Sequence, residues 1–192
     1  MKLGVFGGTF DPPHAGHLIV AEHAREELGL DHVLFVPSTI SPHKRHDQLS
    51  NPVYRLEMVQ LALMGQTSLQ PCDVEVKRGG LSYTVDTLQQ LRGMYPRDEL
   101  SLLIGLDNLT EFNSWKSPAD ILALASVVGL TRPGFEQGEA SVETMKGVTL
   151  CRVPAVEISS REIRERVRCG KSIRFLVPRT VESYIYYRKL YK

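Results

Sequence analysis

Cysteine is scarce in this sequence, and long hydrophobic runs are absent. The three cysteines, Cys72, Cys151 and Cys169, stand far apart without a Cys-x-x-Cys pair, so neither a disulfide framework nor a zinc ribbon is expected. The longest charge-free apolar stretch is the 11 residues from Ile121 to Thr131, whereas a membrane-spanning helix needs roughly 20. The apolar run at residues 3–6 is too short for the core of a secretory signal. These absences predict a cytoplasmic protein with reduced thiols and no transmembrane segment.

The composition excludes several other classes of protein. With 192 residues, 42% of them hydrophobic and 23% charged, the chain is not disordered, collagen-like or a coiled coil. Its length suits one α/β domain, with or without a small appendage. The net charge of +1 is unevenly distributed, because residues 158–192 hold 10 Lys and Arg against 3 Asp and Glu. This basic segment could bind nucleic acid, bind a small anion or solvate a helix face.

Apolar strand patterns alternate with helical patterns along the chain. Strands are expected at residues 2–6, 31–37, 69–76, 100–105, 126–131 and 148–153, and helices at 16–28, from 52 onward, 84–94, 118–124, 160–168 and 178–190. This alternation predicts the α/β class, a Rossmann-like doubly wound parallel sheet. We expect a single domain over residues 1–192, with residues 159–192 as a small C-terminal helical subdomain packed on it. Ligands of such sheets bind beyond the carboxyl ends of the strands, so the loops after residues 6, 37, 76, 105 and 132 are the candidate binding loops.

The loop after the first strand has the features of a phosphate site. It reads Gly7-Gly8-Thr9-Phe10-Asp11-Pro12-Pro13-His14-Ala15-Gly16-His17. The paired glycines let the backbone approach a ligand, and the helix that begins near Gly16 offers free N–H groups and the positive end of its dipole. His14 and His17 are three residues apart, so both imidazoles can point to one place and donate hydrogen bonds to phosphate oxygens. The alternative is an ordinary strand-to-helix turn with two surface histidines.

This extended loop resembles the signature of the nucleotidyltransferase superfamily, and in its long form that of the bacterial nicotinate mononucleotide adenylyltransferases. Four later segments resemble the same family in the same order. They are Val36–Lys44, the loop after the second strand; Gly80–Leu88, the pyridine-nucleotide loop; Ile104–Asp107 with Phe112 and Trp115, the Gly-x-Asp region; and Ile158–Arg164, the Ile-Ser-Ser-Thr-x-Ile-Arg motif. Arg161 departs from the last motif, where the family often has threonine, so the role of this position is open.

The resemblance implies a nucleotidyltransferase fold and a transferase that acts on ATP and nicotinate mononucleotide. The products would be deamido-NAD and pyrophosphate, a step of NAD biosynthesis. The attacking phosphate is already an anion, so the in-line displacement needs no general base. Mg²⁺ is expected on the ATP phosphates and not in a metal site of the protein. These small-molecule partners leave no role for nucleic acid or a membrane, and the sequence leaves a homo-oligomer open.

The resemblance also assigns residues to the site. The catalytic groups on the phosphates would be His14, His17, Lys44 and Arg164; the ATP-binding residues would be Gly7, Gly8, Thr9, Phe10, Gly105, Asp107, Ser159 and Ser160; and the mononucleotide would contact Tyr83, Thr84 and Trp115. Asp11 is interpreted as a hydrogen-bond acceptor that shapes the loop and not as a base.

Several of these residues have a structural alternative. Lys44 could belong to a solvated basic loop, and Thr84 or Asp107 could merely cap a helix. Ser159 and Glu162 form the pattern of a capping box, and Trp115 could be part of the core. At the level of function, the alternatives are another nucleotidyltransferase, such as one acting on phosphopantetheine, and a nucleotide-binding module without turnover.

Overall fold

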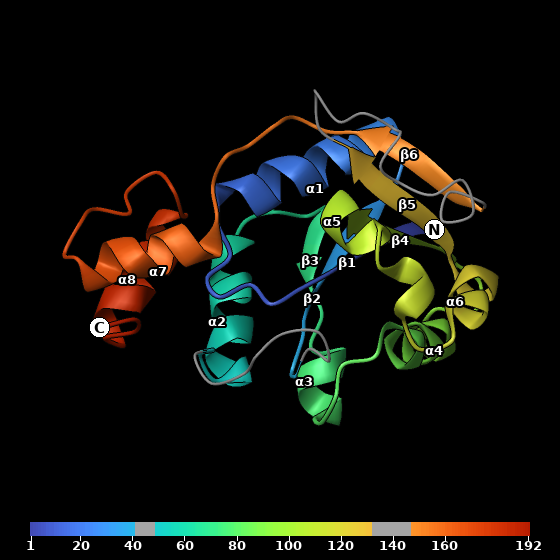
Figure 1. Ribbon diagram of the computed structural model, residues 1–192, viewed down its shortest axis with the longest axis horizontal. Coiled ribbons are helices and arrows are strands. Elements are labelled where there is room, and N and C mark those ends of the chain that lie inside the picture. Colours follow the sequence, from blue (N-terminus) through green and yellow to red (C-terminus); the bar gives the residue numbers. More distant parts are fainter. Residues whose placement is uncertain (41–48, 132–146) are drawn as a thin grey trace.

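The computed structural model describes residues 1–40, 49–131 and 147–192. In these ranges six parallel strands form one sheet: β1 (Lys2–Gly8), β2 (His32–Pro37), β3 (Leu69–Pro71), β4 (Glu99–Gly105), β5 (Ser126–Thr131) and β6 (Val148–Arg152). The helices are α1 (Ala15–Glu27), α2 (Pro52–Ala62), α3 (Val74–Arg78), α4 (Thr84–Met94), α5 (Leu106–Leu109), the 3-10 helix η1 (Phe112–Ser114), α6 (Pro118–Leu124), α7 (Ser160–Arg168) and α8 (Arg179–Tyr187). Figure 1 shows the helices arranged around the sheet.

The strand order is β3-β2-β1-β4-β5-β6, which places the first strand at the centre of the sheet. All neighbouring strands run parallel, and β1 pairs with β2 from Leu3 opposite His32 to Gly8 opposite Pro37. The chain builds one half of the sheet outward from β1 and then the other half outward from β4, which is the doubly wound order. The predicted α/β Rossmann-like fold is therefore confirmed. The boundary between β1 and β4 is the switch point where such sheets bind ligands.

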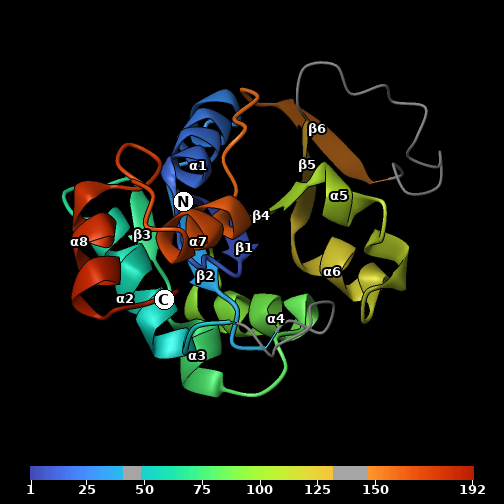
Figure 2. The same cartoon turned by 60° about the vertical axis from the view of Figure 1, so that its left-hand side comes forward.

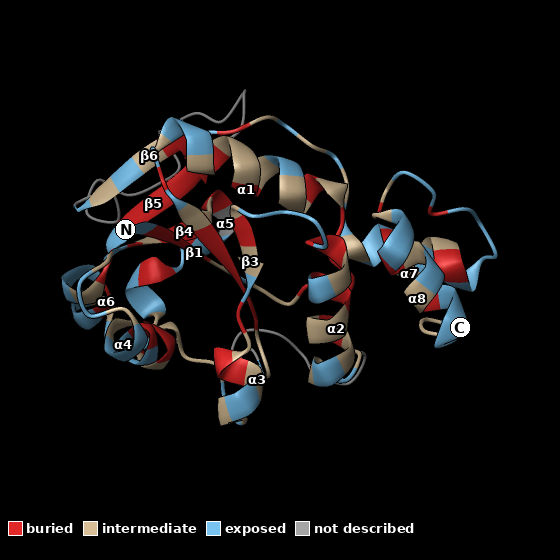
Figure 3. Ribbon diagram, turned by 180° about the vertical axis from the view of Figure 1, so that it is seen from behind, coloured by how far each residue is buried: buried red, intermediate tan, exposed pale blue. Residues whose placement is uncertain are grey.

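Helices cover both faces of the sheet, as its continuously apolar strands require. On one face, buried residues of β1, β2 and β4 such as Val5 pack against α3, α4, α5 and α6. On the other face, residues such as Phe35 pack against α1 and α2. Figure 3 shows the buried residues concentrated in the strands and on the helix sides turned toward them. None of the described helices has the length and apolar character required to cross a bilayer.

The C-terminal helices form a third apolar cluster with the outer side of α2. Met58 and Ala62 of α2 meet Ile163 of α7 and Ile185 of α8 there. Figures 1 and 2 both show α7 and α8 beside α2, at the end of the molecule away from β6. The last segment of the chain thus packs next to the helix that follows β2, close to the beginning of α1.

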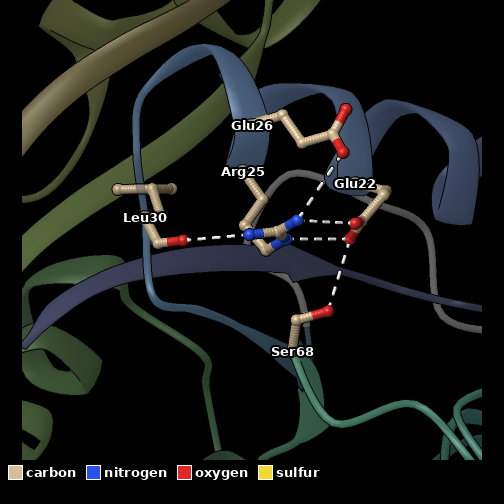
Figure 4. A network of polar contacts seen from close by, with 5 residues as sticks. All are labelled: Glu22, Arg25, Glu26, Leu30 and Ser68. Atoms are coloured by element: carbon tan, nitrogen blue, oxygen red, sulfur yellow. Dashed lines mark hydrogen bonds and ion pairs between the residues drawn. The ribbon is translucent and has the colours of Figure 1, made fainter.

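A surface network of hydrogen bonds lies at the amino ends of β2 and β3, on the side of the sheet away from the predicted ligand edge. Arg25 of α1 donates two hydrogen bonds to Glu22 and one to the carbonyl of Leu30, and Ser68 contacts the same Glu22 carboxylate at 3.5 Å (Figure 4). The hydrogen bond to Arg25 lowers the pKa of Glu22. Exposed pairs of this kind contribute little stability, and this one joins elements at the amino ends of the strands, far from the predicted ligand edge.

Two expectations from the sequence were wrong in detail, and two short helices were not expected. Residues 69–76 do not form one strand, because β3 ends at Pro71 and Val74–Arg78 is helical. Proline cannot donate to a sheet ladder, and the turn allows both Val74 and Glu75 to be buried. The last helix ends at Tyr187 and not at residue 190, since Lys189 adopts a left-handed φ of 53°. The short helices α5 and η1 lack enough turns to give a periodic signal.

Candidate active site

A cavity of about 580 Å³ opens at the carboxyl ends of β1 and β4, which is the switch point of the sheet. It brings together most of the residues that the sequence assigned to the site: Gly7, Gly8, Thr9, Phe10, His17, Tyr83, Thr84, Gly105, Trp115, Ser160 and Arg164. The predicted binding edge is therefore the one with the cavity. Lys44 lies outside the described residues, and the same holds for the side chain of Asp107.

The two glycines of the first loop serve different purposes. A Cβ on Gly7 would have no described atom within 4 Å, so the backbone there borders open space in the cavity. A Cβ on Gly8 would lie 2.9 Å from the ring of Phe10, so this glycine leaves room for that ring. Phe10 is buried with a left-handed φ of 49°, and its ring packs beside Phe35 under the loop. Phe10 therefore borders the cavity, while its ring belongs to the core.

His14 and His17 lie face to face at the start of α1. Their ring centroids are 3.6 Å apart with 26° between the planes. The backbone N–H of His14 donates to Nδ1 of His17 at 3.2 Å, so the neutral His17 ring carries its proton on Nε2. His17 is the member of the pair that borders the cavity.

Burial determines the protonation state of His14, the other histidine of the pair. His14 is 6% exposed, and burial lowers the pKa of its imidazole to about 4, so this ring is neutral at physiological pH. Its Nδ1 has no hydrogen-bond partner among the described residues. A Cβ on Gly16 would lie 3.1 Å from that Nδ1. The glycine in His-x-Gly-His thus makes room for the His14 ring.

Asp11 holds the middle of the loop through both of its carboxylate oxygens. The carboxylate is 1% exposed; one oxygen accepts from the backbone N–H of Ser50 at 3.1 Å and the other from the hydroxyl of Tyr191 at 2.6 Å. Both oxygens are therefore occupied by structural contacts. This geometry agrees with the interpretation of Asp11 as an acceptor that shapes the loop.

Residues of the C-terminal motif brace the same loop from the other side. Arg164 donates from Nη1 to the carbonyl of Asp11 at 2.7 Å, and Ser160 donates from Oγ to the carbonyl of Pro12 at 2.8 Å. Ser159 instead caps α7, since its Oγ accepts from the backbone N–H of Glu162 at 3.1 Å. The capping alternative thus holds for Ser159. Arg164 borders the cavity as well, so its guanidinium both supports the loop and adds positive charge to the site.

Arg55 is a functional candidate that the sequence analysis missed. Its guanidinium is 1% exposed and donates to the carbonyls of Ser50, Thr9, Ser38 and Thr39 at 2.6–3.0 Å. It therefore ties together the glycine loop, the loop after β2 and the start of α2. Burial lowers the pKa of Arg55, and the nearby charges of Asp11 and Glu75 oppose that effect. A signal was present, because an arginine occupied the same helical stripe as the buried residues Met58, Val59 and Ala62.

The start of α4 forms the far end of the cavity. Tyr83 is the N-cap residue and makes no side-chain capping bond within the described structure, and Thr84 is the first helical residue. The capping alternative for Thr84 is therefore wrong, and the helix start borders the cavity. Lys116 adds a cation there, with Nζ 4.5 Å from the Tyr83 ring centroid and 3.0 Å from a carboxylate oxygen of Asp86.

Trp115 and Glu75 lie at the same end of the cavity. Trp115 is half-buried and packs against the first core cluster, with its ring centroid 5.6 Å from that of Phe112. It also borders the cavity, so the core alternative and the binding role are compatible. Glu75 is 7% exposed, and burial raises the pKa of its carboxyl group. One of its oxygens accepts from the hydroxyl of Thr87 at 2.6 Å. Glu75 was not expected, because its segment was predicted to be a strand.

Comparisons with known proteins agree with this fold. Residues 5–166 match the cytidylyltransferase-like family. The chain is 39% identical over 191 residues to the nicotinate-nucleotide adenylyltransferase of Bacillus subtilis, covering 100% of this chain and 98% of that protein. It is 40% identical over 192 residues to a protein of Salinibacter ruber named probable nicotinate-nucleotide adenylyltransferase, covering 100% of this chain and 98% of the relative.

A solved structure shares the fold at lower identity. The Plasmodium falciparum nicotinic acid mononucleotide adenylyltransferase complexed with NaAD superposes with a TM-score of 0.80 at 18% identity, over 99% of this chain and 97% of that one. Fold and site together define a nucleotidyltransferase of the cytidylyltransferase-like class. Within that class, the chain belongs to the nicotinate-nucleotide adenylyltransferase family.

Proposed function

We propose that this protein transfers the adenylyl group of ATP to nicotinate mononucleotide, giving deamido-NAD and pyrophosphate in NAD biosynthesis. The observation that carries the proposal is the juxtaposition, in one cavity at the switch point, of the open backbone at Gly7, the cavity-facing His17 ring and the Arg164 guanidinium. A glycine loop at a helix start with two added donors suits a polyphosphate. The family to which the chain belongs supports this specific reaction.

The chemistry that these residues can perform is alignment and charge stabilisation. The 5′-phosphate of the mononucleotide attacks the α-phosphorus of ATP. The bond between the α-phosphorus and the oxygen that bridges it to the β-phosphorus breaks, and pyrophosphate leaves with the negative charge. Nε2–H of His17 donates to a phosphate oxygen on which charge develops, and Arg164 balances the charge of the leaving group. His14 stacks on His17 and holds it through the backbone hydrogen bond. Lys44 is proposed to act on the β- and γ-phosphates.

The residues present fit a metal ion that arrives with the nucleotide. Among the described residues, no three His, Cys, Asp or Glu side chains come together as a metal site, and both oxygens of Asp11 have other partners. Mg²⁺ commonly binds through substrate phosphates and water with few protein ligands. When bound to ATP, it would neutralise part of the triphosphate charge.

The far end of the cavity suits the nicotinate ring. The start of α4 at Thr84 has no side-chain cap among the described residues and offers backbone N–H groups to a carboxylate. The ammonium of Lys116, which is paired with Asp86, lies nearby over the Tyr83 ring. The indole of Trp115 supplies an aromatic surface for the pyridine ring. We propose that Gly105 and Asp107 hold the ATP ribose, as expected from the position after a buried strand.

The proposal extends to the organisation of the chain. Residues 1–192 would act as one nucleotidyltransferase domain, because Ser160, Arg164 and Tyr191 of the helical subdomain 159–192 hydrogen bond directly to the glycine loop. The cytoplasmic location, the absence of a nucleic-acid partner and the oligomeric state stay predictions.

A single assay tests the reaction. The protein is incubated with ATP and Mg²⁺ and, separately, with nicotinate mononucleotide, nicotinamide mononucleotide or phosphopantetheine, and pyrophosphate release and the dinucleotide product are measured. We expect the fastest turnover with nicotinate mononucleotide and a product with the mass of deamido-NAD. Faster turnover with phosphopantetheine would assign the protein to another branch of the superfamily. ATP binding without pyrophosphate release would indicate a binding module.

A further inference from the structure

Tyr191, near the end of the chain, contacts the glycine loop that follows β1. The hydroxyl of Tyr191 donates to Oδ1 of Asp11 at 2.6 Å, across a separation of 180 positions in the sequence. Burial and the neighbouring Asp11 carboxylate raise the pKa of Tyr191, so the phenol keeps its proton and acts as a donor throughout the physiological range.

The backbone after α8 is shaped to make this contact. Lys189 and Tyr191 both adopt left-handed φ values, 53° and 64°, which turn the chain back after the helix ends at Tyr187. The Tyr191 ring packs against the third core cluster, and its hydroxyl also lies 3.8 Å from Sδ of Met58. Non-glycine residues rarely adopt such φ values without compensating contacts. These contacts hold the residues after α8 in one conformation, in which the Tyr191 hydroxyl reaches Asp11.

Three segments that are distant in the sequence hydrogen bond to the loop at Asp11. Tyr191 binds one carboxylate oxygen, the backbone N–H of Ser50 at the start of α2 binds the other, and Arg164 of α7 binds the main-chain carbonyl. Asp11 also lies three residues before His14, whose backbone N–H in turn fixes the ring of His17. A displacement of Asp11 would therefore pass directly to the two imidazoles.

We propose that Tyr191 is a positioning residue for the adenylyl transfer: by holding the Asp11 carboxylate it fixes the path of the loop and hence the place at which Nε2 of His17 meets the phosphates. This inference rests on the proposed function. Tyr191 touches no substrate, and its effect is exerted through Asp11. A displacement of about 1 Å at reacting groups can reduce a rate by about 10²-fold, so a loosened loop is expected to lower kcat more than substrate binding.

The test removes one hydroxyl and keeps the ring. Tyr191→Phe preserves the packing against the third cluster. Tyr187→Phe is the matched control, because Tyr187 lies four residues earlier, at the end of α8, and is 81% exposed. We expect Tyr191→Phe to lower kcat about tenfold, with the KM for ATP changed less than threefold and most of the thermal stability retained. Tyr187→Phe is expected to behave like the unmodified protein.

A double-mutant cycle separates positioning from a general loss of stability. Asp11→Ala removes the acceptor and Tyr191→Phe removes the donor of the same hydrogen bond, so the double variant should be little slower than Asp11→Ala alone. Rates are measured well below the midpoint of thermal unfolding of every variant. An unchanged kcat in Tyr191→Phe, or fully multiplicative losses in the double variant, would overturn the inference while leaving the proposed function intact. If the unmodified protein releases no pyrophosphate with any mononucleotide, the proposed function fails first and the inference fails with it.

Discussion

The backbone N–H of His14 donates to Nδ1 of His17 at 3.2 Å, and the two rings stack with their centroids 3.6 Å apart. This hydrogen bond selects the His17 tautomer that carries its proton on Nε2. His17 is thereby a hydrogen-bond donor while neutral and needs no added proton to meet a phosphate. The spacing of three residues in His-x-Gly-His has a direct reason, because the third residue of the helix is the one that can accept from the N-cap backbone.

Replacement of His17 tests its role as a donor. His17→Ala is expected to lower kcat by about 10²-fold or more, since removal of one preorganised donor has an effect of this size in comparable sites. Steady-state pyrophosphate release measures the rate, and a thermal melt checks the fold. His23→Ala is the matched control, because His23 lies on the same helix and does not border the cavity. Turnover near that of the unmodified protein in His17→Ala would exclude a chemical role for the ring.

The buried state of His14 makes the stability of the protein depend on pH. In the unfolded chain the imidazole has its ordinary pKa of 6.5, whereas burial lowers the pKa to about 4 in the fold. The unfolded state therefore binds more protons as the pH falls below 6.5. The stability associated with neutral His14 is complete above that pH and is lost as the pH falls toward 4.

This dependence can be isolated with a residue that does not titrate. The free energy of unfolding is measured from pH 7.5 to pH 4.5 for the unmodified protein and for His14→Gln. The unmodified protein should lose about 2–3 kcal/mol more than the variant over this range, given the lowered pKa. Parallel curves for the two proteins would show that His14 titrates normally in the fold.

The open space at Gly7 predicts a specific effect of a single methyl group. Gly7→Ala should leave the thermal stability almost unchanged, because the new Cβ meets no described protein atom. It should raise the KM for ATP, because Gly7 lines the cavity in which we propose that the nucleotide binds. Gly4→Ala is the contrasting control, since its Cβ would lie 2.9 Å from Cδ1 of Leu30. That variant should be destabilised by about 1–3 kcal/mol with little change in KM. A large loss of stability in Gly7→Ala with no change in KM would place the nucleotide elsewhere.

Trp115 offers a test of the pyridine end of the cavity. Trp115→Ala should raise the KM for nicotinate mononucleotide about threefold to tenfold, the range expected for the loss of one aromatic contact. The KM for ATP should stay nearly constant and serves as the internal control. Equal effects on both substrates would remove Trp115 from the mononucleotide site and leave it with its packing role beside Phe112.

The local parts of the site were predictable from the sequence, and the long-range parts were not. The glycine loop, His14 and His17 lie within one contiguous segment, so their spacing alone indicates a phosphate site. The strand that ends at Gly105 was equally visible from its continuous apolar run. These features depend on residues that are neighbours in the chain.

Arg55 and Tyr191 depend on contacts that no local pattern encodes. The bond from Tyr191 to Asp11 spans 180 positions, and the guanidinium of Arg55 satisfies carbonyls from three separate segments. Arg55 could have been suspected, because a charge at a core position of a helix requires buried partners. Tyr191 gave no such signal, since nothing in the sequence distinguishes it from the other tyrosines of the last segment. Glu75 was hidden by the incorrect extension of β3.

The most direct test of the account is a crystal structure of the protein with Mg²⁺ and a non-hydrolysable ATP analogue. We predict that the phosphates lie against Gly7 and Gly8, with a phosphate oxygen about 3 Å from Nε2 of His17. A triphosphate bound outside the cavity, or a His17 ring turned away from it, would contradict the account.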